Sequence, residues 1–251
     1  MNFRFLGTGN AGGVPLYGCK CPACARSWLT KDHQRHAASA LIETSTIRLL
    51  LDAGIPTLGD RFPAGSVAAI LLTHYHMDHV QGLFPIRWGT DTRMQVIGPE
   101  DPAGCDDLFK HPGILDFGTK AQPFDEFDLG DLCITPLPLT HSRPTLGYAF
   151  EQAGCRIAYL TDTCGLPTET EQWLLAHRPD VLILDCSYPP RAQTPRNHND
   201  LNMALQIFDR LQPRRCYLTH VDHSFDAWLM EGAQALPPDM EVAYDGQVLV
   251  I

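Results

Sequence analysis

The chain has 251 residues, of which 44% are hydrophobic and 19% are charged, and this balance is typical of a globular protein with a buried core. Its formal net charge is -10 at pH 7. Because surfaces that bind nucleic acids are usually basic, we expect no nucleic-acid partner, while a small anionic substrate is compatible with the charge if metal ions dominate the site.

The first residues, MNFRFLGTGNAGG, lack the basic segment, apolar run and cleavage site of a signal peptide. No stretch approaches the roughly 20 apolar residues of a membrane span. We therefore expect a cytoplasmic protein with no membrane partner. We expect the nine cysteines to form no disulfide framework, because thiols stay reduced in such a compartment and because their number is odd.

Three cysteines lie within the segment YGCKCPAC, residues 17–24: Cys19, Cys21 and Cys24. This spacing fits a disulfide pair with a spare thiol, a reactive thiol cluster, or three ligands of a metal ion. Tetrahedral zinc needs a fourth ligand from elsewhere in the chain. The other six cysteines are scattered, and we expect most of them to be plain buried thiols: Cys105, Cys133, Cys155, Cys164, Cys186 and Cys216.

Short apolar runs along the chain have the length and composition of strands. The run FRFLG leads into the glycine-rich segment GTGNAGG. Six later runs each end in a residue that can take part in chemistry: Asp52, His74, His141, Asp162, Asp185 and His220. We expect these strand ends to lie close together and to form one site.

Helical segments are predicted at about 79–89, 167–178, 199–211 and 225–235. Strands that first form hairpins and later alternate with helices indicate two sheets covered by helices, an αββα sandwich or an arrangement close to it. No composition shift marks an interior boundary, so residues 1–251 are predicted to form a single domain.

The segment THYHMDH, residues 73–79, is the most informative stretch of the chain. It places four potential ligands within six positions after a predicted buried strand: His74, His76, Asp78 and His79. On a loop that enters a helix, such residues can face two neighbouring metal ions. The additional ligands that two metals need are supplied most naturally by His141, Asp162 and His220.

A pair of divalent ions activates water and neutralises a phosphoryl or acyl oxygen, so hydrolysis is the favoured reaction. In the loop PPRAQTPRNHNDLN, residues 189–202, His198 belongs to neither ligand set and can act as a general acid; the alternative is a surface histidine. Arg191 and Arg196 can hold a phosphate, although loop arginines are more often solvated.

The pattern His-x-His-x-Asp-His with a later His, Asp and His resembles the metallo-β-lactamase superfamily over essentially the whole chain. The resemblance implies an α/β fold in which two central mixed β-sheets are flanked by helices. It also implies that one metal is bound by His74, His76 and His141, and the other by Asp78, His79 and His220. Asp162 would bridge the two ions, and Asp52 would orient ligands.

A closer resemblance joins GCKCPAC, LLTHYHMDHVQGLFPIRWG, GCDDLFKHPGILDF, PPRAQTPRNHNDLN and LTHVDHSFDAWLME. Together they are similar to the phosphoribosyl 1,2-cyclic phosphate phosphodiesterases of the carbon-phosphorus lyase pathway. This family implies hydrolysis of 5-phosphoribosyl 1,2-cyclic phosphate to ribosyl 1,5-bisphosphate during phosphonate catabolism. It further implies manganese at the binuclear site, with zinc as the other candidate, and a homodimer. His198 would protonate the leaving oxygen, and Asp78 joins it as a catalytic residue.

Two further assignments follow from this resemblance. In GCDDLFKHPG, residues 104–113, Lys110 and His111 would contact the distal phosphate, with a solvated loop as the alternative. His223 has no task at the binuclear centre and would be the fourth ligand of a structural zinc in an N-terminal loop of about residues 17–36. His33 and His36 are the alternative ligands, in a charged segment.

Other functions remain open at this point. A tRNA 3′-processing endonuclease is the main enzymatic alternative, and such enzymes carry a basic, flexible arm that this chain lacks. A thioesterase of the glyoxalase II type would leave His198 and the arginine loop without a role. A non-catalytic metal-binding scaffold is the alternative of another class, but such proteins commonly lose ligands, and all seven candidates are present.

Overall fold

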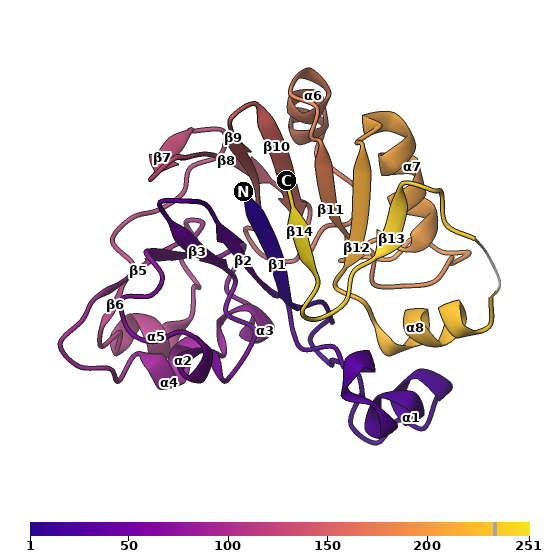
Figure 1. Cartoon of the computed structure of the whole chain (residues 1–251), viewed down its shortest axis with the longest axis horizontal. Coiled ribbons are helices and arrows are strands. Elements are labelled where there is room, and N and C mark those ends of the chain that lie inside the picture. The colour runs from indigo at the N-terminus through magenta and orange to yellow at the C-terminus, as the bar shows by residue number, and fades with distance from the viewer. Residues whose placement is uncertain (233–234) are drawn as a thin grey trace.

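The computed structural model describes residues 1–232 and 235–251. Two mixed sheets of seven strands face each other, and helices cover their outer sides (Figure 1). The predicted sandwich of helix-covered sheets is therefore confirmed. Within the described part of the chain, no helix has the length and apolar character needed to cross a bilayer.

The first sheet has the strand order β14-β1-β2-β3-β4-β5-β6. Its strands are β1 (Asn2–Gly7), β2 (Ser39–Glu43), β3 (Arg48–Leu51), β4 (Ala69–Leu71), β5 (Met94–Ile97), β6 (Leu115–Asp116) and β14 (Val248–Val250). Neighbours from β14 to β3 pair antiparallel, and those from β3 to β6 pair parallel. The parallel half requires crossover connections, and short helices supply them.

The second sheet has the order β13-β12-β11-β10-β9-β8-β7. Its strands are β7 (Phe127–Leu129), β8 (Leu132–Pro138), β9 (Leu146–Gln152), β10 (Cys155–Leu160), β11 (Val181–Asp185), β12 (Arg215–Thr219) and β13 (Met240–Val242). Neighbours from β7 to β10 pair antiparallel, and those from β10 to β13 pair parallel. Each sheet thus joins an antiparallel half to a parallel half.

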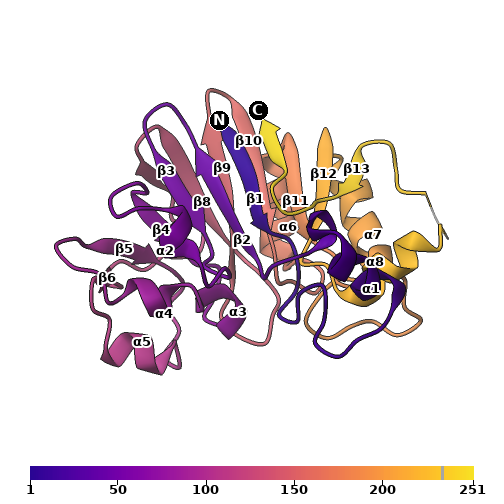
Figure 2. The same cartoon turned by 60° about the horizontal axis from the view of Figure 1, so that its bottom comes forward.

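The helices lie in two groups on the outer sides of the sheets (Figures 1 and 2). The first sheet is accompanied by α2 (Leu58–Arg61), α3 (Met77–Val80), α4 (Leu83–Ile86) and α5 (Asp106–Lys110). The second is covered by α6 (Thr168–Ala176), α7 (Leu201–Leu211) and α8 (His223–Met230). Beside α8 lies an N-terminal lobe made of α1 (Pro22–Leu29) and the short helix η1 (Lys31–His33).

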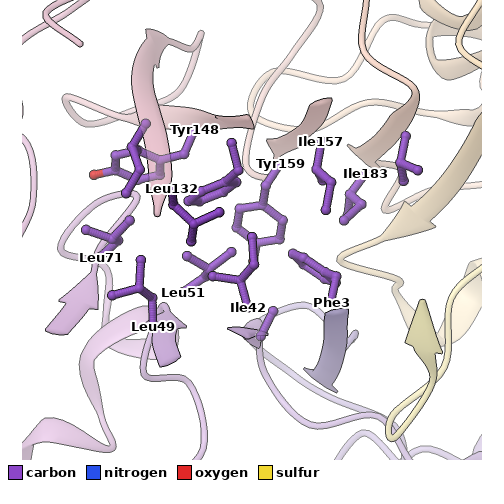
Figure 3. Close-up of a cluster of buried hydrophobic side chains, with 14 of the residues drawn as sticks. Phe3, Ile42, Leu49, Leu51, Leu71, Leu132, Tyr148, Ile157, Tyr159 and Ile183 are labelled. Atoms are coloured by element: carbon purple, nitrogen blue, oxygen red, sulfur yellow. The ribbon is translucent and has the colours of Figure 1, made fainter. Parts of the chain in front are cut away.

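The main core fills the space between the sheets (Figure 3). Alternation along β1 shows how the sequence builds it, because Phe3 and Phe5 are buried while Asn2 and Arg4, which alternate with them, are exposed. Strands β4 and β11 are buried along their whole length, as expected of strands covered on both faces. The buried Tyr148 hydroxyl finds a partner by donating to the carbonyl oxygen of Leu72 at 2.7 Å.

Helix α7 follows its sequence signals closely. Asp200 accepts a hydrogen bond from the backbone N–H of Met203 and caps the helix. Its buried side chains recur at helical spacing and face the second sheet: Leu201, Ala204, Ile207 and Leu211. The predicted helices at 167–178 and 199–211 are therefore confirmed with slightly shorter bounds.

The helix predicted at 79–89 is wrong, since two short helices, α3 and α4, replace it. Pro85 has no N–H to donate to the carbonyl oxygen of Gln81, so a continuous helix would lose that bond. Gly82 donates to the carbonyl oxygen of Ala53 instead. The helix predicted at 225–235 begins earlier, at His223, and ends at Met230; positions 233–234 of that prediction lie outside the described residues.

The expectation that most of the scattered cysteines are buried is wrong. Cys186 and Cys216 are buried, whereas Cys105, Cys133, Cys155 and Cys164 are only half-buried. Cys133 illustrates the reason, because it lies between the inward-facing Leu132 and Ile134 and therefore faces outward from β8.

Arg35 ties four separate segments together. Its guanidinium makes a two-pronged ion pair with Asp226 of α8, at 2.8 and 3.0 Å. Its Nη1 donates to the Thr8 hydroxyl at 2.8 Å and to the carbonyl oxygen of Ala243 at 2.5 Å. The side chains of Arg35 and Asp226 are only 10% and 5% exposed. The pair therefore fixes the N-terminal lobe to the end of the fold.

Replacing Arg35 by Met is expected to destabilise the protein by about 3–5 kcal/mol, because the Asp226 carboxylate would stay buried without its partner. Urea unfolding followed by circular dichroism measures the change. Arg214→Met is the matched control: Arg214 pairs with Asp180 but is 84% exposed, so its loss should cost under about 1 kcal/mol. Equal effects of the two substitutions would contradict the role given to Arg35.

Candidate active site

Seven of the predicted residues converge at the ends of strands from both sheets. The first sheet supplies the segment 73–79 after β4, and the second supplies residues after β8, β10 and β12. The donor atoms of one group lie within 4.8 Å of one another and come from His74, His76 and His141. Those of a second group meet the same limit and come from Asp78, His79, Asp162 and His220. The predicted convergence of strand ends is therefore present.

The first group consists of three imidazole nitrogens that face a common point. The His76 Nδ1 atom lies 2.8 Å from His74 Nε2 and 3.1 Å from His141 Nε2. Burial and the neighbouring imidazoles lower the pKa values of His74, His76 and His141, so the three rings are uncharged near neutral pH and offer lone pairs. A cation is the natural occupant of such a point.

The second group surrounds a carboxylate. His79 Nε2 lies 3.1 Å from Asp162 Oδ2, and His220 Nε2 lies 3.3 Å from Asp162 Oδ1. Asp78 Oδ2 is 3.4 and 3.6 Å from the same two nitrogens. Although both nitrogens are fully buried, neither has a hydrogen-bond partner of acceptable geometry among the described residues. Buried polar atoms without partners are rare, and a metal ion that accepted the lone pairs of both nitrogens would satisfy them.

Imidazole and carboxylate groups of this second group lie close enough to shift one another's pKa values. Burial opposes the imidazolium form of His79, but Asp162, Asp52 and Asp78 outweigh it and raise the pKa of His79 well above its usual value. The same balance, led by Asp162, raises the pKa of His220 to about 9. Burial also opposes the charge of Asp162, yet His220 and His79 hold its pKa well below the usual range. Without metal, protonated histidines thus balance the carboxylates.

Asp162 lies between the two groups. Its Oδ1 atom is 3.7 Å from His141 Nε2 and 3.9 Å from His74 Nε2, in addition to its contacts with the second group. Asp52, Asp162 and His220 all have positive φ angles, of 56°, 62° and 61°. A left-handed backbone is uncommon outside glycine and gathers at functional sites, where the surroundings enforce it.

Asp52 lies behind His79, with its Oδ2 atom 3.0 Å from His79 Nδ1. It also accepts from the N–H of Thr73 at 2.8 Å, and the Thr73 hydroxyl lies 3.0 Å from His74 Nδ1. Sequence reasoning missed Thr73 and also Ser187, whose hydroxyl lies 2.9 Å from His220 Nδ1. A polar residue two positions after a strand end is the only signal that could have found them.

His198 stands beside the second group and is 17% exposed. Its ring stacks on His220 with centroids 4.6 Å apart, and its Nδ1 atom lies 2.8 Å from Asp185 Oδ2. Asn199 braces the loop by donating to the carbonyl oxygen of Asp185 and accepting from the N–H of Gly165. Asp185, noted in the sequence only as a strand end, thus emerges as the residue that holds His198.

The two loop arginines differ in their surroundings. The Arg191 guanidinium lies 3.5 Å from the ring centroid of Tyr188, and that ring is 6.3 Å from the His198 ring. Arg196 is exposed and has no ion pair among the described residues. Lys110 pairs with Asp106 on the exposed surface of α5, and His111 is exposed at its end. Arg191, which is also exposed, is thus linked to His198 through the Tyr188 ring.

The cysteines predicted to bind zinc form a separate cluster. The sulfur atoms of Cys19 and Cys21 lie 3.5 and 3.4 Å from His223 Nδ1, and Cys24 completes a group whose atoms all lie within 4.8 Å. His36 instead lies 2.7 Å from an Asp245 oxygen, and His33 is exposed on η1. Burial raises the pKa of Cys24 to about 12. Zinc binds thiolates, so its binding would displace the proton of Cys24. Three cysteines, of which Cys24 is buried and the other two are half-buried, form with one imidazole a donor set that fits zinc.

Comparisons with known proteins agree with this geometry. The family model described as "Beta-lactamase superfamily domain" matches residues 47–221. An octanoyltransferase of Porphyromonas gingivalis is 27% identical over 271 aligned positions, which cover all of this chain and 52% of that protein. A ribonuclease Z of Methanopyrus kandleri is 33% identical over 160 positions, or 59% of this chain and 49% of that protein. The chain therefore spans about half the length of these two curated relatives.

Two solved structures share the fold across nearly the whole chain. A diphosphatase from the PhnP family has a TM-score of 0.81 at 24% identity, with 99% of this chain and 96% of that chain covered. Zinc-bound PqqB from Methylobacterium extorquens has a TM-score of 0.81 at 17% identity, with both chains covered completely. These identities speak for the fold alone, whereas the family model spans more than half of the sequence. The chain belongs to the β-lactamase superfamily.

Proposed function

We propose that this protein is a binuclear metal-dependent phosphodiesterase that hydrolyses a small cyclic phosphodiester, 5-phosphoribosyl 1,2-cyclic phosphate, to ribosyl 1,5-bisphosphate in phosphonate catabolism. The observation that carries the proposal is the position of His198 beside a cluster of seven metal-type donors. The names diphosphatase and ribonuclease Z, carried by two similar proteins, point in the same direction.

One metal would be held by His74, His76 and His141, and the other by Asp78, His79 and His220, with Asp162 between them. Manganese or zinc suits these imidazole and carboxylate donors. The two ions would supply Lewis acidity toward a phosphoryl oxygen and activation of water. Thr73, Asp52 and Ser187 would keep the donor rings in place through the hydrogen bonds described above.

His198 is assigned as the general acid that protonates the leaving group. Asp185 accepts the Nδ1 proton of His198, which leaves the opposite nitrogen, Nε2, free to donate a proton to the leaving alkoxide oxygen. Asp185 acts as a positioning residue, because its own carboxylate is completely buried. Positioning of this kind keeps the imidazole in one tautomer and one orientation.

Arg191 is assigned to the distal phosphate of the substrate. Stacking on Tyr188, whose ring centroid lies 6.3 Å from that of His198, holds the guanidinium in place, so little side-chain freedom is lost when a phosphate binds. Lys110 and His111, which are exposed at the end of α5, are the alternative contacts for this phosphate. A compact pentose with two phosphoryl groups suits a site that combines a metal centre with one nearby guanidinium.

Phosphorus NMR of the cyclic ribosyl phosphate, incubated with protein and Mn²⁺, tests the function. Conversion of the cyclic diester signal into a phosphomonoester signal is expected. The ribonuclease Z relative makes a tRNA 3′-processing endonuclease the second candidate. Release of a 3′ trailer from precursor tRNA, with no conversion of the cyclic substrate, would favour it. Metal binding without turnover of either substrate would favour a non-catalytic scaffold.

Oligomeric state is a separate expectation. Several apolar side chains of the N-terminal lobe are exposed, namely Tyr17, Trp28 and Leu29, at 99%, 71% and 87%. A homodimer would bury apolar area there, and light scattering coupled to gel filtration measures the mass.

Replacing His198 by Gln should lower kcat about 100-fold or more for a substrate with an alkoxide leaving group, the usual contribution of a general acid. Bis(p-nitrophenyl) phosphate should be affected far less, because p-nitrophenolate leaves without a proton. Asp185→Asn should show the same substrate dependence with a smaller loss. His177→Gln, at an exposed position at the end of α6, is the control. Equal losses on both substrates would remove His198 from proton transfer.

Replacing Arg191 by Met should raise KM for the cyclic substrate about tenfold, while its activity toward the analogue without the 5-phosphate stays unchanged. Arg196→Met is the matched control in the same loop and should change neither value. An Arg191→Met variant with equal effects on the two substrates would show that the guanidinium does not bind the distal phosphate.

Replacing Cys19 by Ser should remove one zinc per chain and leave the two ions of the binuclear centre, because the cysteine cluster is built from separate residues. Mass spectrometry of metals in the purified protein measures the ratio. Cys133→Ser, at a half-buried thiol of β8, should leave the ratio unchanged. Identical zinc content in the two variants would rule Cys19 out as a ligand.

A further inference from the structure

A cavity of about 770 Å³ lies at the outer edge of the first sheet, beside β6 and the end of α5. Its walls include aromatic and aliphatic side chains, Phe109, Ile114 and Phe117, and two basic residues, Arg93 and Lys120. None of the seven donor residues of the candidate active site lines it. The cavity is therefore separate from the metal centre. In Figure 1, β6 lies at the outer edge of the first sheet and α5 lies near it.

The Lys120 ammonium is held inside a cage of aromatic rings. Its Nζ atom lies 5.0 Å from the ring centroid of Phe109, 5.7 Å from that of Tyr75 and 5.9 Å from that of Phe117. All three distances fall within the range of cation–π attraction. Nζ also donates to the Tyr75 hydroxyl at 3.3 Å. Since an ammonium has three protons to donate, this contact leaves others for a ligand.

The Lys120 ammonium forms no ion pair with a carboxylate in the part of the chain that the structure describes. Arg93, the other basic residue on the cavity wall, pairs with Asp116 at 3.0 Å. Within residues 1–232 and 235–251, Lys120 has no carboxylate within 4.0 Å. Burial lowers the pKa of Lys120, against a smaller opposing effect of Glu100. In a chain with a net charge of -10, an unpaired cation that faces a cavity is unusual.

Tyr75 connects the cage to the metal-binding segment, because it lies between His74 and His76. Its ring is 2% exposed and meets Phe109 edge to face with centroids 5.3 Å apart. Gly98 leaves room for it, since a Cβ atom there would lie 2.8 Å from the Tyr75 hydroxyl. The cage is thus a rigid, preformed surface of the kind that binds ligands without large rearrangement.

We propose that this cavity is a binding site for a small organic anion, whose charged group contacts Lys120 and whose planar or apolar body packs against Phe109, Ile114 and Phe117. The site is independent of the proposed phosphodiesterase function. Its chemistry combines one cation with apolar walls, so an anion with an apolar body fits better than a free inorganic ion.

Fluorescence titration of the metal-loaded, full chain with 1-anilinonaphthalene-8-sulfonate tests the proposal, because this probe joins a planar apolar body to one sulfonate. Lys120→Met should weaken its binding about tenfold, and Lys120→Arg should retain it. The uncharged probe N-phenyl-1-naphthylamine should bind Lys120→Met and the wild type equally. Lys31→Met, at an exposed lysine of η1, is the control and should change neither titration.

Two further variants test whether the probes bind in this cavity and whether the Lys120→Met effect comes from loss of the charge. Thr92→Trp narrows the cavity from its wall and should weaken both probes, which places them there. Combining Lys120→Met with Tyr75→Phe removes the hydroxyl that the first change leaves without a donor, so a fold defect can be separated from loss of the charge. Unchanged sulfonate binding in the folded Lys120→Met variant would overturn the proposal. Competition between the sulfonate and bis(p-nitrophenyl) phosphate would overturn the separation from the catalytic centre.

Discussion

The structure depends on one buried carboxylate, that of Asp162, which lies among imidazoles from both sheets. A charge at such a depth is tolerated only when opposite charge surrounds it. His79 and His220 can provide that charge as imidazolium groups, and metal ions can provide it when the same rings are neutral. Proton binding and metal binding at this point are therefore alternatives, and the two sheets must meet correctly for either to occur.

The mirrored construction of the two sheets explains why the donors meet. In each sheet an antiparallel half continues into a parallel half, and residues that follow β4, β10 and β12 leave the sheets at the same edge. The carboxyl ends of parallel strands are where ligands commonly bind in α/β proteins. A core of interlocking side chains, including Leu51, Leu71 and Tyr159, holds the distance between the sheets (Figure 3).

Sequence reasoning could predict most of this centre, because apolar runs that end in His or Asp reveal both a strand and its functional end. It missed the roles of Thr73, Asp185 and Ser187, since a small polar residue beside a strand end looks the same whether it touches solvent or a ligand ring. Short strands such as β6 and β13 were not anticipated, because two or three residues carry no periodic signal. The break before α4 depended on the tertiary contact of Gly82 with Ala53.

The left-handed backbone at Asp52, Asp162 and His220 has a consequence for how such centres change during evolution. A random substitution at one of these positions alters the side chain and the strain in the chain path at the same time. Glycine and asparagine accept this backbone more readily than most residues, so they provide the easiest routes by which a relative could lose a donor and keep its fold. Bulky or β-branched replacements would disturb the meeting of the two sheets as well.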